Sequence, residues 1–288
     1  MVLPVAWMDC TWGLDDTVNA SDIPKALRCA TRVARRAGSL LLRHLAAPKR
    51  IDLKAHHDIK LELDRRTQRL IERLLRREFP NVSVLGEEGN VGDPAAAWRW
   101  VVDPIDGTVN FTRGIPHACV SIALQRRLPG SSGWDGYESV VGVVWDPFLE
   151  EMWTARLGAR AHLNGRVIAV SDTRQLRDAV VTLGFAKSAA SVRRNLPVFS
   201  RLCSRVMKVR IMGSAALALA WTAAGRLDAY REEGICLWDI AAGGLILECA
   251  GGEFHREPLS QRFTYRLWAT NGLLRGQLER AIKPSRRR

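Results

Sequence analysis

The first part of the chain alternates apolar and polar positions at helical spacing. From Ser21-Asp22 onward apolar residues recur every three or four positions, which predicts an amphipathic helix that begins there. Its buried stripe comprises Leu27, Ala30, Val33, Ala34, Ala37, Leu41 and Leu45. A second set of apolar residues at the same spacing predicts another helix, which begins at Asp64 and ends before Pro80. Residues 1–20 show no such period, and we expect them to form an N-terminal extension.

The pattern then changes to short apolar runs bounded by turn residues. Runs of this kind are typical of strands. They lie at residues 82–85, 100–102, 118–124, 140–145 and 152–156. The Asn164-Gly165 pair that follows favours a tight hairpin turn, so we expect a hairpin to continue the same sheet.

Beyond Ser171, predicted strands and helices alternate. The strands lie near residues 180–182, 208–212, 228–231 and 267–269, and the helices near 191–206, 214–224, 238–249 and 273–282. This alternation indicates an α/β fold. We expect one unit over residues 21–288, with an N-terminal half at about 21–165 and a C-terminal half at about 166–288.

The composition excludes several classes of protein. With 288 residues, 47% hydrophobic and 25% charged, the chain is long and apolar enough to bury a full core, which excludes disorder as a description of the whole. No apolar run approaches the roughly 20 residues of a membrane-spanning helix. The six cysteines are scattered without a CxxC pair, so we expect reduced thiols in a cytoplasmic protein.

The charge balance is unusual. Lys and Arg number 43 against 30 Asp and Glu, a formal net charge of +13, and most of the basic residues are arginine. Such a surplus permits nucleic acid, an anionic membrane or an anionic substrate as partner. An arginine-biased solvated surface, produced by a GC-rich genome, is the alternative explanation.

Two aspartates directly follow a predicted strand. Residues 100–108 read Trp-Val-Val-Asp-Pro-Ile-Asp-Gly-Thr, so Asp103 and Asp106 flank a proline at the end of the strand. The proline fixes the backbone, and both carboxylates and the Ile105 carbonyl can converge on a hard cation, which prefers oxygen ligands. The Gly-Thr pair then offers backbone N–H groups where a helix or turn begins, and these attract phosphate. An aspartate-rich surface turn is the alternative.

Two further acids stand at the ends of predicted elements. Glu87 lies in a Gly-Glu-Glu-Gly segment after another strand, where an ordinary surface loop is the alternative. Asp239 begins an apolar helix in the Leu-Trp-Asp-Ile-Ala-Ala-Gly segment at 237–243, where an N-cap is the alternative. Each is weak evidence alone, and the combination with residues 103–108 points to a site.

In this order and at these separations, the three motifs resemble the inositol monophosphatase family of Mg-dependent, lithium-sensitive phosphatases. The resemblance extends from about residue 24 to about residue 282. It implies a layered αβαβα sandwich, which agrees with the pattern of a helix pair, a sheet, and then mixed helices and strands. It also implies a homodimer.

The resemblance further implies Mg²⁺ as cofactor, with two or three ions in each site. Glu87, Asp103 and the Ile105 carbonyl would hold the first ion. Asp103, Asp106 and Asp239 would hold the second. Glu87 would also contact a weakly bound third ion.

The catalytic roles are likewise implied by the resemblance. Asp64 and Thr108 would act together as the base system for water beside Glu87, and the N–H groups of Gly107 and Thr108 would bind phosphate. Metal-activated water would then act in a single in-line displacement, which needs no covalent intermediate. Asp64 has an alternative role as the cap of the second predicted helix.

Substrate contacts follow from weaker matches. Glu232 stands seven residues before Asp239, where the family uses a glutamate toward ring hydroxyls, but the adjacent Glu233 leaves this assignment open. Ser214 and Ala215 match the family's small-residue segment against the same ring. These matches predict hydrolysis of inositol monophosphate or a related sugar or polyol phosphate.

Several other functions remain open from the sequence. Fructose-1,6-bisphosphatase, histidinol-phosphatase and 3′-phosphoadenosine-5′-phosphate phosphatase activities use the same metal core in relatives, since substrate choice lies elsewhere. An alternative of a different class is a nucleic-acid or transcription-associated binding role. The net charge of +13 permits it.

Overall fold

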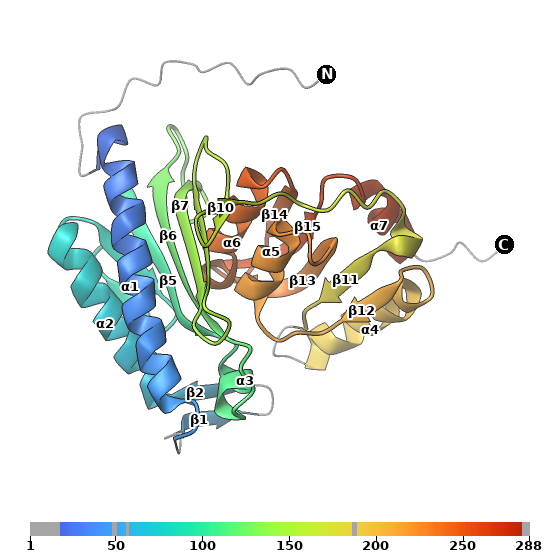
Figure 1. The fold of residues 1–288 in the computed structure, drawn as a ribbon, viewed down its shortest axis with the longest axis horizontal. Coiled ribbons are helices and arrows are strands. Elements are labelled where there is room, and N and C mark those ends of the chain that lie inside the picture. The colour runs from blue at the N-terminus through green and yellow to red at the C-terminus, as the bar shows by residue number, and fades with distance from the viewer. Residues whose placement is uncertain (1–17, 48–50, 56–57, 186–188, 284–288) are drawn as a thin grey trace.

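Helices and sheets alternate in five layers in the computed structural model of the protein (Figure 1). The structure describes residues 18–47, 51–55, 58–185 and 189–283. The extension expected at residues 1–20 lies outside the described residues as far as residue 17. Its last residue belongs to a 3-10 turn, Ala20–Asp22, which leads into the first helix.

Two amphipathic helices, α1 (Ile23–His44) and α2 (Glu62–Glu78), form the first layer. The predicted stripe of α1 packs against the first sheet, and Pro24 occupies the first turn, where its missing N–H costs no hydrogen bond. Helix α2 begins at Glu62, so the expectation that Asp64 opens or caps it is wrong. Glu62 and Leu63 favour helix themselves and extend it by two residues toward the N-terminus.

The second layer is an eight-stranded sheet in the order β10-β9-β8-β7-β6-β5-β3-β4. Its strands are β3 (Ser83–Gly86), β4 (Gly89–Val91), β5 (Trp98–Asp106), β6 (Cys119–Arg127), β7 (Tyr137–Asp146), β8 (Glu151–Arg156), β9 (His162–Leu163) and β10 (Arg166–Val167). Strand β5 is buried along its whole length and is longer than the run expected at residues 100–102. The predicted Asn164-Gly165 hairpin is confirmed as the β9-β10 turn.

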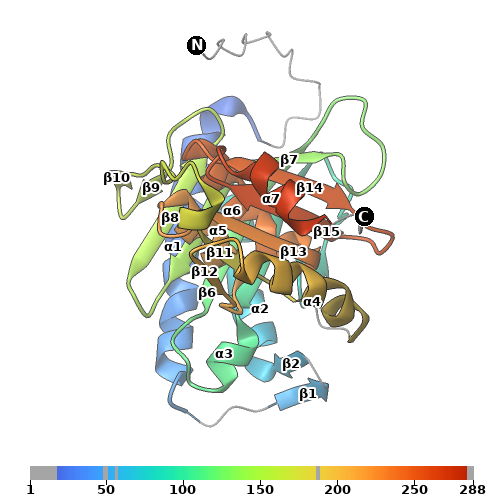
Figure 2. The ribbon, with the colours of Figure 1, turned by 90° about the vertical axis from the view of Figure 1, so that its right-hand side faces the viewer.

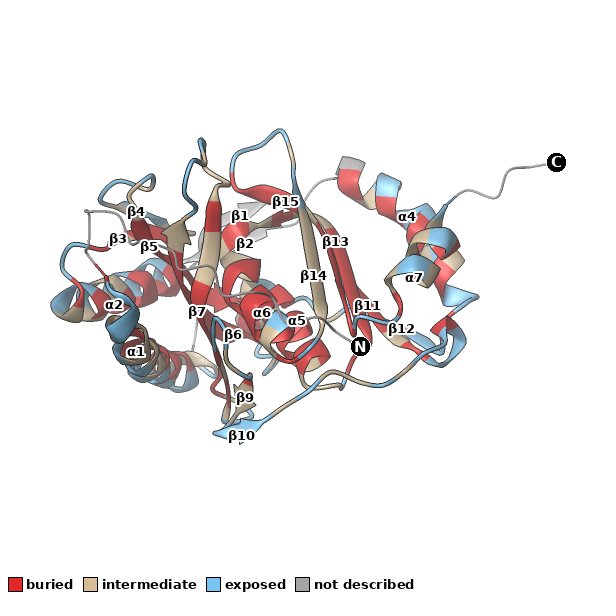
Figure 3. Cartoon of the chain, turned by 90° about the horizontal axis from the view of Figure 1, so that it is seen from above, coloured by how far each residue is buried: buried red, intermediate tan, exposed pale blue. Residues whose placement is uncertain are grey.

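The central layer consists of α5 (Ala215–Ala223) and α6 (Leu237–Cys249), which are buried on nearly all sides between the two sheets (Figure 3). Such burial explains why both helices are apolar all round. The second sheet has the order β12-β11-β13-β15-β14. Its strands are β11 (Val180–Leu183), β12 (Lys208–Arg210), β13 (Ala229–Cys236), β14 (Glu253–Pro258) and β15 (Thr264–Thr270).

The outer helices α4 (Ala189–Cys203) and α7 (Arg275–Ile282) cover the far side of the second sheet. The five layers confirm the predicted αβαβα sandwich. A short 3-10 turn, Leu176–Asp178, precedes β11. Sequence analysis missed β14 because this half-exposed edge strand mixes charged and apolar residues without alternation.

Smaller elements lie below the first sheet. The hairpin β1 (Ile51–Ala55) and β2 (Asp58–Leu61) contacts the short helix α3 (Thr108–Thr112), which follows β5 (Figure 2). None of these three elements was predicted, because each is shorter than a clear hydrophobic period. Among the helices of the described residues, none has the length and apolar character needed to cross a bilayer.

Candidate active site

Three aspartates from two layers meet at one point. Asp103 and Asp106 lie at the end of β5, and Asp239 lies in the first turn of α6. Each offers a carboxylate oxygen, and these oxygens all lie within 4.8 Å of one another. Asp103 and Asp106 are buried, and Asp239 is half-buried. A buried cluster of oxygen donors fits a hard divalent cation.

The backbone after β5 is shaped by hydrogen bonds within the aspartate segment. The Asp103 Oδ1 accepts from the Ile105 N–H at 2.9 Å, and the Thr108 hydroxyl donates to the Ile105 carbonyl at 2.9 Å. Gly107 has a φ of 96°, and a Cβ there would lie 2.8 Å from the His117 carbonyl oxygen. Glycine is therefore required at this turn, which brings the start of α3 close to the carboxylates.

Asp106 is oriented by the start of α5. The Ser214 hydroxyl and the Ala216 N–H each donate to Oδ2 at 2.6 Å, and the Ala215 N–H donates to Oδ1 at 3.3 Å. Ser214 is also the N-cap of α5. Ser214 and Ala215, expected from the sequence to contact substrate, both line the site cavity and also hold the Asp106 carboxylate.

Asp239 is not the N-cap that the sequence allowed as the alternative, because α6 begins two residues earlier, at Leu237, and Cys236 is its N-cap. The Asp239 Oδ2 accepts from the N–H of Cys236 at 2.9 Å. The same carboxylate belongs to the aspartate cluster. The capping hydrogen bond fixes the side chain, so it also positions the carboxylate toward Asp103 and Asp106.

The carboxylates raise one another's proton affinity. Burial, and after it the charge of Glu87, raises the pKa of Asp103 well above its usual range. Burial and the charge of Asp106 do the same for Asp239. Burial also raises the pKa of Asp106, although the hydrogen bonds from Ser214 and Ala216 oppose that shift. The full negative charge of the cluster therefore requires a compensating cation.

Glu87 lies near the cluster because β3 and β5 are parallel neighbours, although its carboxylate is not among the oxygens that lie within 4.8 Å of one another. Gly86 pairs with Val102, so the chain leaves β3 beside the end of β5, and the Glu87 N–H donates to the Val102 carbonyl at 3.3 Å. Parallel strands end at the same edge of a sheet, which is why two motifs distant in sequence meet here.

A cavity of about 710 Å³ opens beside these groups. The predicted site residues that line it are Glu87, Asp103, Ile105, Asp106, Gly107, Thr108, Ser214, Ala215, Glu232 and Asp239. Asp64 is not among the lining residues and lies buried in the first turn of α2. The structure thus brings ten of the eleven predicted residues to one cavity.

The structure distinguishes Glu232 from its neighbour. Glu232 is buried, and the Tyr230 hydroxyl donates to its Oε2. Glu233 instead forms ion pairs with Arg194 and Arg266, both at 3.1 Å. These arginines neutralise Glu233, which leaves Glu232 better suited to receive a substrate hydroxyl.

Two polar residues that sequence analysis missed support the site. Gln68 of α2 accepts from the Glu88 N–H at 2.8 Å and donates to the Gly89 carbonyl at 2.9 Å, so it holds the loop that carries Glu87. Asn110 donates to the carbonyls of His117 and Met212, both at 2.9 Å, and ties α3 to the segment before α5. A polar residue at a buried position of the α2 stripe was the one sequence signal for Gln68.

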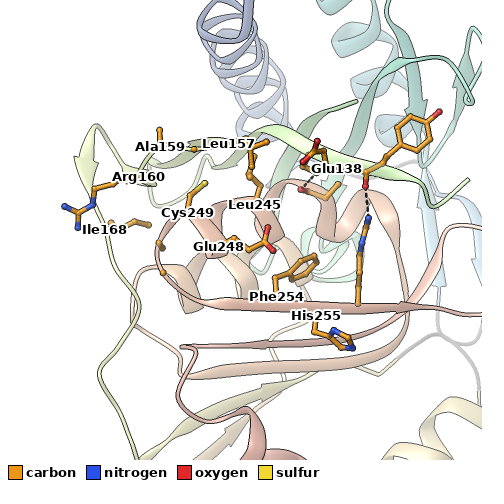
Figure 4. Close-up of a pocket in the computed structure, with 17 residues that line it drawn as sticks. Glu138, Leu157, Ala159, Arg160, Ile168, Leu245, Glu248, Cys249, Phe254 and His255 are labelled. Atoms are coloured by element: carbon orange, nitrogen blue, oxygen red, sulfur yellow. Dashed lines mark hydrogen bonds between the residues drawn. The ribbon is translucent and has the colours of Figure 1, made fainter. Parts of the chain in front are cut away.

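A second and larger hollow, of about 950 Å³, lies between β7, the end of α6 and the edge strand β14 (Figure 4). Its charged residues are mixed, with Glu138 and Glu248 beside Arg160 and Arg256. The aspartate cluster does not line it. The clustered carboxylates, and not cavity size, therefore mark the candidate active site.

Comparisons with known proteins agree with this geometry. The model of the inositol monophosphatase family matches residues 22–274. An inositol-1-monophosphatase of Synechocystis is 35% identical over 269 residues, covering 91% of this chain and 90% of the relative. A Nus factor SuhB of Xylella fastidiosa is 37% identical over 230 residues, covering 79% of this chain and 80% of the relative.

A solved structure extends the similarity to three dimensions. The inositol monophosphatase of Anabaena superimposes with a TM-score of 0.77 at 34% identity, over 91% of this chain and 96% of that one. The matched region includes both aspartate motifs and nearly the whole five-layer fold. The chain therefore belongs to the inositol monophosphatase family of phosphatases, which confirms the resemblance that its motifs carried.

Proposed function

We propose that the protein is a Mg²⁺-dependent hydrolase of a small phosphate monoester, with inositol monophosphate or a related sugar or polyol phosphate as substrate. The observation that carries this proposal is the cluster of Asp103, Asp106 and Asp239, with carboxylate oxygens within 4.8 Å of one another. The cavity beside the cluster also contains Glu232, a group suited to hydroxyls.

On the family resemblance, the site would hold two or three Mg²⁺ ions. Glu87, Asp103 and the Ile105 carbonyl would hold one, and Asp103 would share a second with Asp106 and Asp239. When bound, the ions would neutralise the charge of the phosphate and make a nearby water more acidic. The Ile105 carbonyl accepts from Thr108 and retains a second lone pair for a cation.

The chain's own groups would position the ester and handle the proton. The N–H groups of Gly107 and Thr108 would bind the phosphate oxygens, and Ser214, Ala215 and Glu232 would contact the alcohol part. On the family resemblance alone, since Asp64 does not line the cavity, Thr108 and Asp64 would act together as the base system for the attacking water. A single in-line displacement then needs no covalent intermediate.

Substrate identity is best tested with a panel of phosphate esters. We expect phosphate release from inositol monophosphate with Mg²⁺, none with EDTA, and inhibition by Li⁺. Fructose 1,6-bisphosphate, histidinol phosphate and 3′-phosphoadenosine 5′-phosphate are the competing substrates. A higher kcat/KM for one of these would replace the assignment, and no release from any ester would overturn the hydrolase proposal.

The pKa shifts of the cluster predict how pH changes the effect of Mg²⁺ on stability. Burial raises the pKa of Asp103 and Asp239, so the metal-free folded protein holds protons that the unfolded chain releases. Their contribution to stability is full at low pH and is lost as pH rises through the raised pKa range. Mg²⁺ binds the deprotonated carboxylates, so the stability that Mg²⁺ adds to the folded protein increases over the same rise in pH.

The measurement is the melting temperature of EDTA-treated protein with and without Mg²⁺. At about a hundredfold excess over its Kd, Mg²⁺ adds about 2.7 kcal/mol, which corresponds to a rise of about 5–10 °C. We expect this rise near pH 8 and a much smaller one near pH 5. An equal rise at both values would show that the cluster does not bind the ion.

The relatives named Nus factor SuhB support a second function, association with the transcription machinery. We also propose a homodimer, on the family resemblance alone, and a cytoplasmic location. The described cysteines, all of them free thiols, support a reducing compartment.

A further inference from the structure

Most of the surplus of basic over acidic residues lies in one layer of the fold. Helices α1 and α2 contain twelve Lys and Arg residues against four Asp and Glu, so these 39 residues contribute eight of the thirteen surplus charges. Residues 286–288, all arginine, contribute three more, which leaves a surplus of two for the rest of the chain. A genomic bias toward arginine would spread the surplus over the whole surface. It does not explain this concentration.

Every arginine of the two helices is exposed. They are Arg28, Arg32, Arg35, Arg36 and Arg43 on α1, and Arg65, Arg66, Arg69, Arg73, Arg76 and Arg77 on α2. Their helical spacing places them on the sides away from the first sheet, as the exposed outer sides in Figure 3 show. The two helices contact each other, and an Arg32–Glu78 ion pair of 2.6 Å joins them. We call this continuous surface the arginine face.

Much of this charge has no internal partner. Within the described part of the chain, no ion pair involves Arg69, Arg73 or Arg76. Together with Arg77 they line a shallow hollow of about 450 Å³ beside β4. Glu72 is the one acidic residue that lines the same hollow, and its carboxylate accepts from Gln68. Four arginines beside a single carboxylate leave a surplus of positive charge, which attracts an external anion.

The residue types on the face select the kind of anion. Neither helix contains Phe, Tyr or Trp, and the ring of His44 is half-buried, so bases of a single strand have little to stack on. Leu42 is the one large apolar side chain exposed on either helix, which gives little to insert into a membrane. Arg35 lies over the ring of Trp145, but that ring is buried and offers no surface to a base. Exposed arginines without exposed aromatic side chains beside them suit the phosphate backbone of a duplex, which is contacted without reading sequence.

The dimensions agree with a duplex. From Arg65 to Arg77 the row on α2 extends about 18 Å, at 1.5 Å per residue. A duplex presents about ten phosphate charges over that length. Several arginines can therefore meet phosphates at once.

We propose that the arginine face binds the backbone of double-stranded nucleic acid, without sequence preference and separately from the catalytic cavity. No residue of α1 or α2 lines that cavity within the described chain. The face lies on the side of the first sheet opposite α5 and α6. Binding there leaves the aspartate cluster accessible, so the two activities are separable by mutation.

The test measures binding of fluorescent duplexes of RNA and of DNA, of equal length, as salt is varied. For about five phosphate contacts, log K falls against log salt with a slope of about −4.5. The triple variant Arg69→Gln, Arg73→Gln, Arg76→Gln should make this slope shallower by about 2.7 and weaken binding in about 0.1 M salt roughly a hundredfold. Its phosphate release should equal that of the wild type, which shows that it is folded.

A matched control removes the same charge elsewhere. Arg160, Arg166 and Arg174 are exposed and lie outside the arginine face. Their replacement by Gln should leave slope and affinity unchanged, and similar affinity for both duplexes would support backbone recognition. The proposal is overturned if the wild type binds neither duplex at low salt or if the control weakens binding equally. Tighter binding to a single strand, or to phosphatidylserine vesicles, would also overturn it.

Discussion

Asp106→Asn is expected to reduce Mg²⁺-dependent phosphate release by at least about a thousandfold, the scale of losing one group that stabilises transition-state charge. Both oxygens of Asp106 accept hydrogen bonds from the start of α5. The amide of asparagine carries no charge and offers one acceptor oxygen in place of two. The cluster therefore loses one negative charge, and we expect its affinity for Mg²⁺ to fall as well.

Asp146 supplies the matched control for this substitution. It is a fully buried aspartate on β7, burial raises its pKa, and its Oδ1 accepts from the N–H groups of Phe148 and Leu149. Asparagine retains that single accepting oxygen. Asp146→Asn should therefore keep phosphate release within about threefold, since it removes no group from the aspartate cluster.

Circular dichroism and the melting temperature establish that both variants are folded. A Mg²⁺ titration followed by melting temperature then measures whether the metal still binds. If Asp106→Asn keeps more than about a tenth of the wild-type rate, Asp106 is no metal ligand of the kind that this chemistry requires. Equal losses in both variants would point to a general effect of buried asparagine.

The aspartate site was predictable because its residues lie where strong sequence signals end. A buried strand that runs directly into Asp103 and Asp106 leaves few places for their side chains, and a tetrad of small and apolar residues marks the helix after Asp239. Both signals are local. The parallel pairing of β3 with β5 was not predicted, and only the family resemblance implied that Glu87 lies near Asp103.

The parts that sequence analysis missed depend on contacts between distant segments. Gln68 is one polar residue in a helix, and its role exists only because the loop after β3 lies against that helix. The predicted start of α2, at Asp64, was two residues late, because neighbouring residues compete to set the end of a helix and a single sequence does not resolve that competition. The different surroundings of Glu232 and Glu233, which both line the cavity, likewise become visible only when Arg194 and Arg266 are placed in space.

The close contact between the first sheet and α6 gives the second large prediction, for Gly142→Ala. A Cβ at Gly142 of β7 would lie 2.7 Å from the carbonyl oxygen of Ala242, a backbone atom that cannot rotate away. Helix α6 must then move away from the sheet. We expect a loss of about 2–3 kcal/mol of stability, which lowers the melting temperature by about 5–10 °C.

The same displacement should reach the metal cluster, because α6 carries Asp239 while the first sheet carries Asp103 and Asp106. A shift of α6 separates these carboxylates, so we expect Gly142→Ala to weaken Mg²⁺ binding by about tenfold or more. Gly276→Ala is the control: its Cβ would meet only the end of the Arg280 side chain, at 3.4 Å, within helix α7. Alanine there should stabilise the protein by up to about 1 kcal/mol and leave Mg²⁺ affinity unchanged. A destabilised Gly142→Ala protein with wild-type Mg²⁺ affinity would show that the two layers tolerate separation without opening the site.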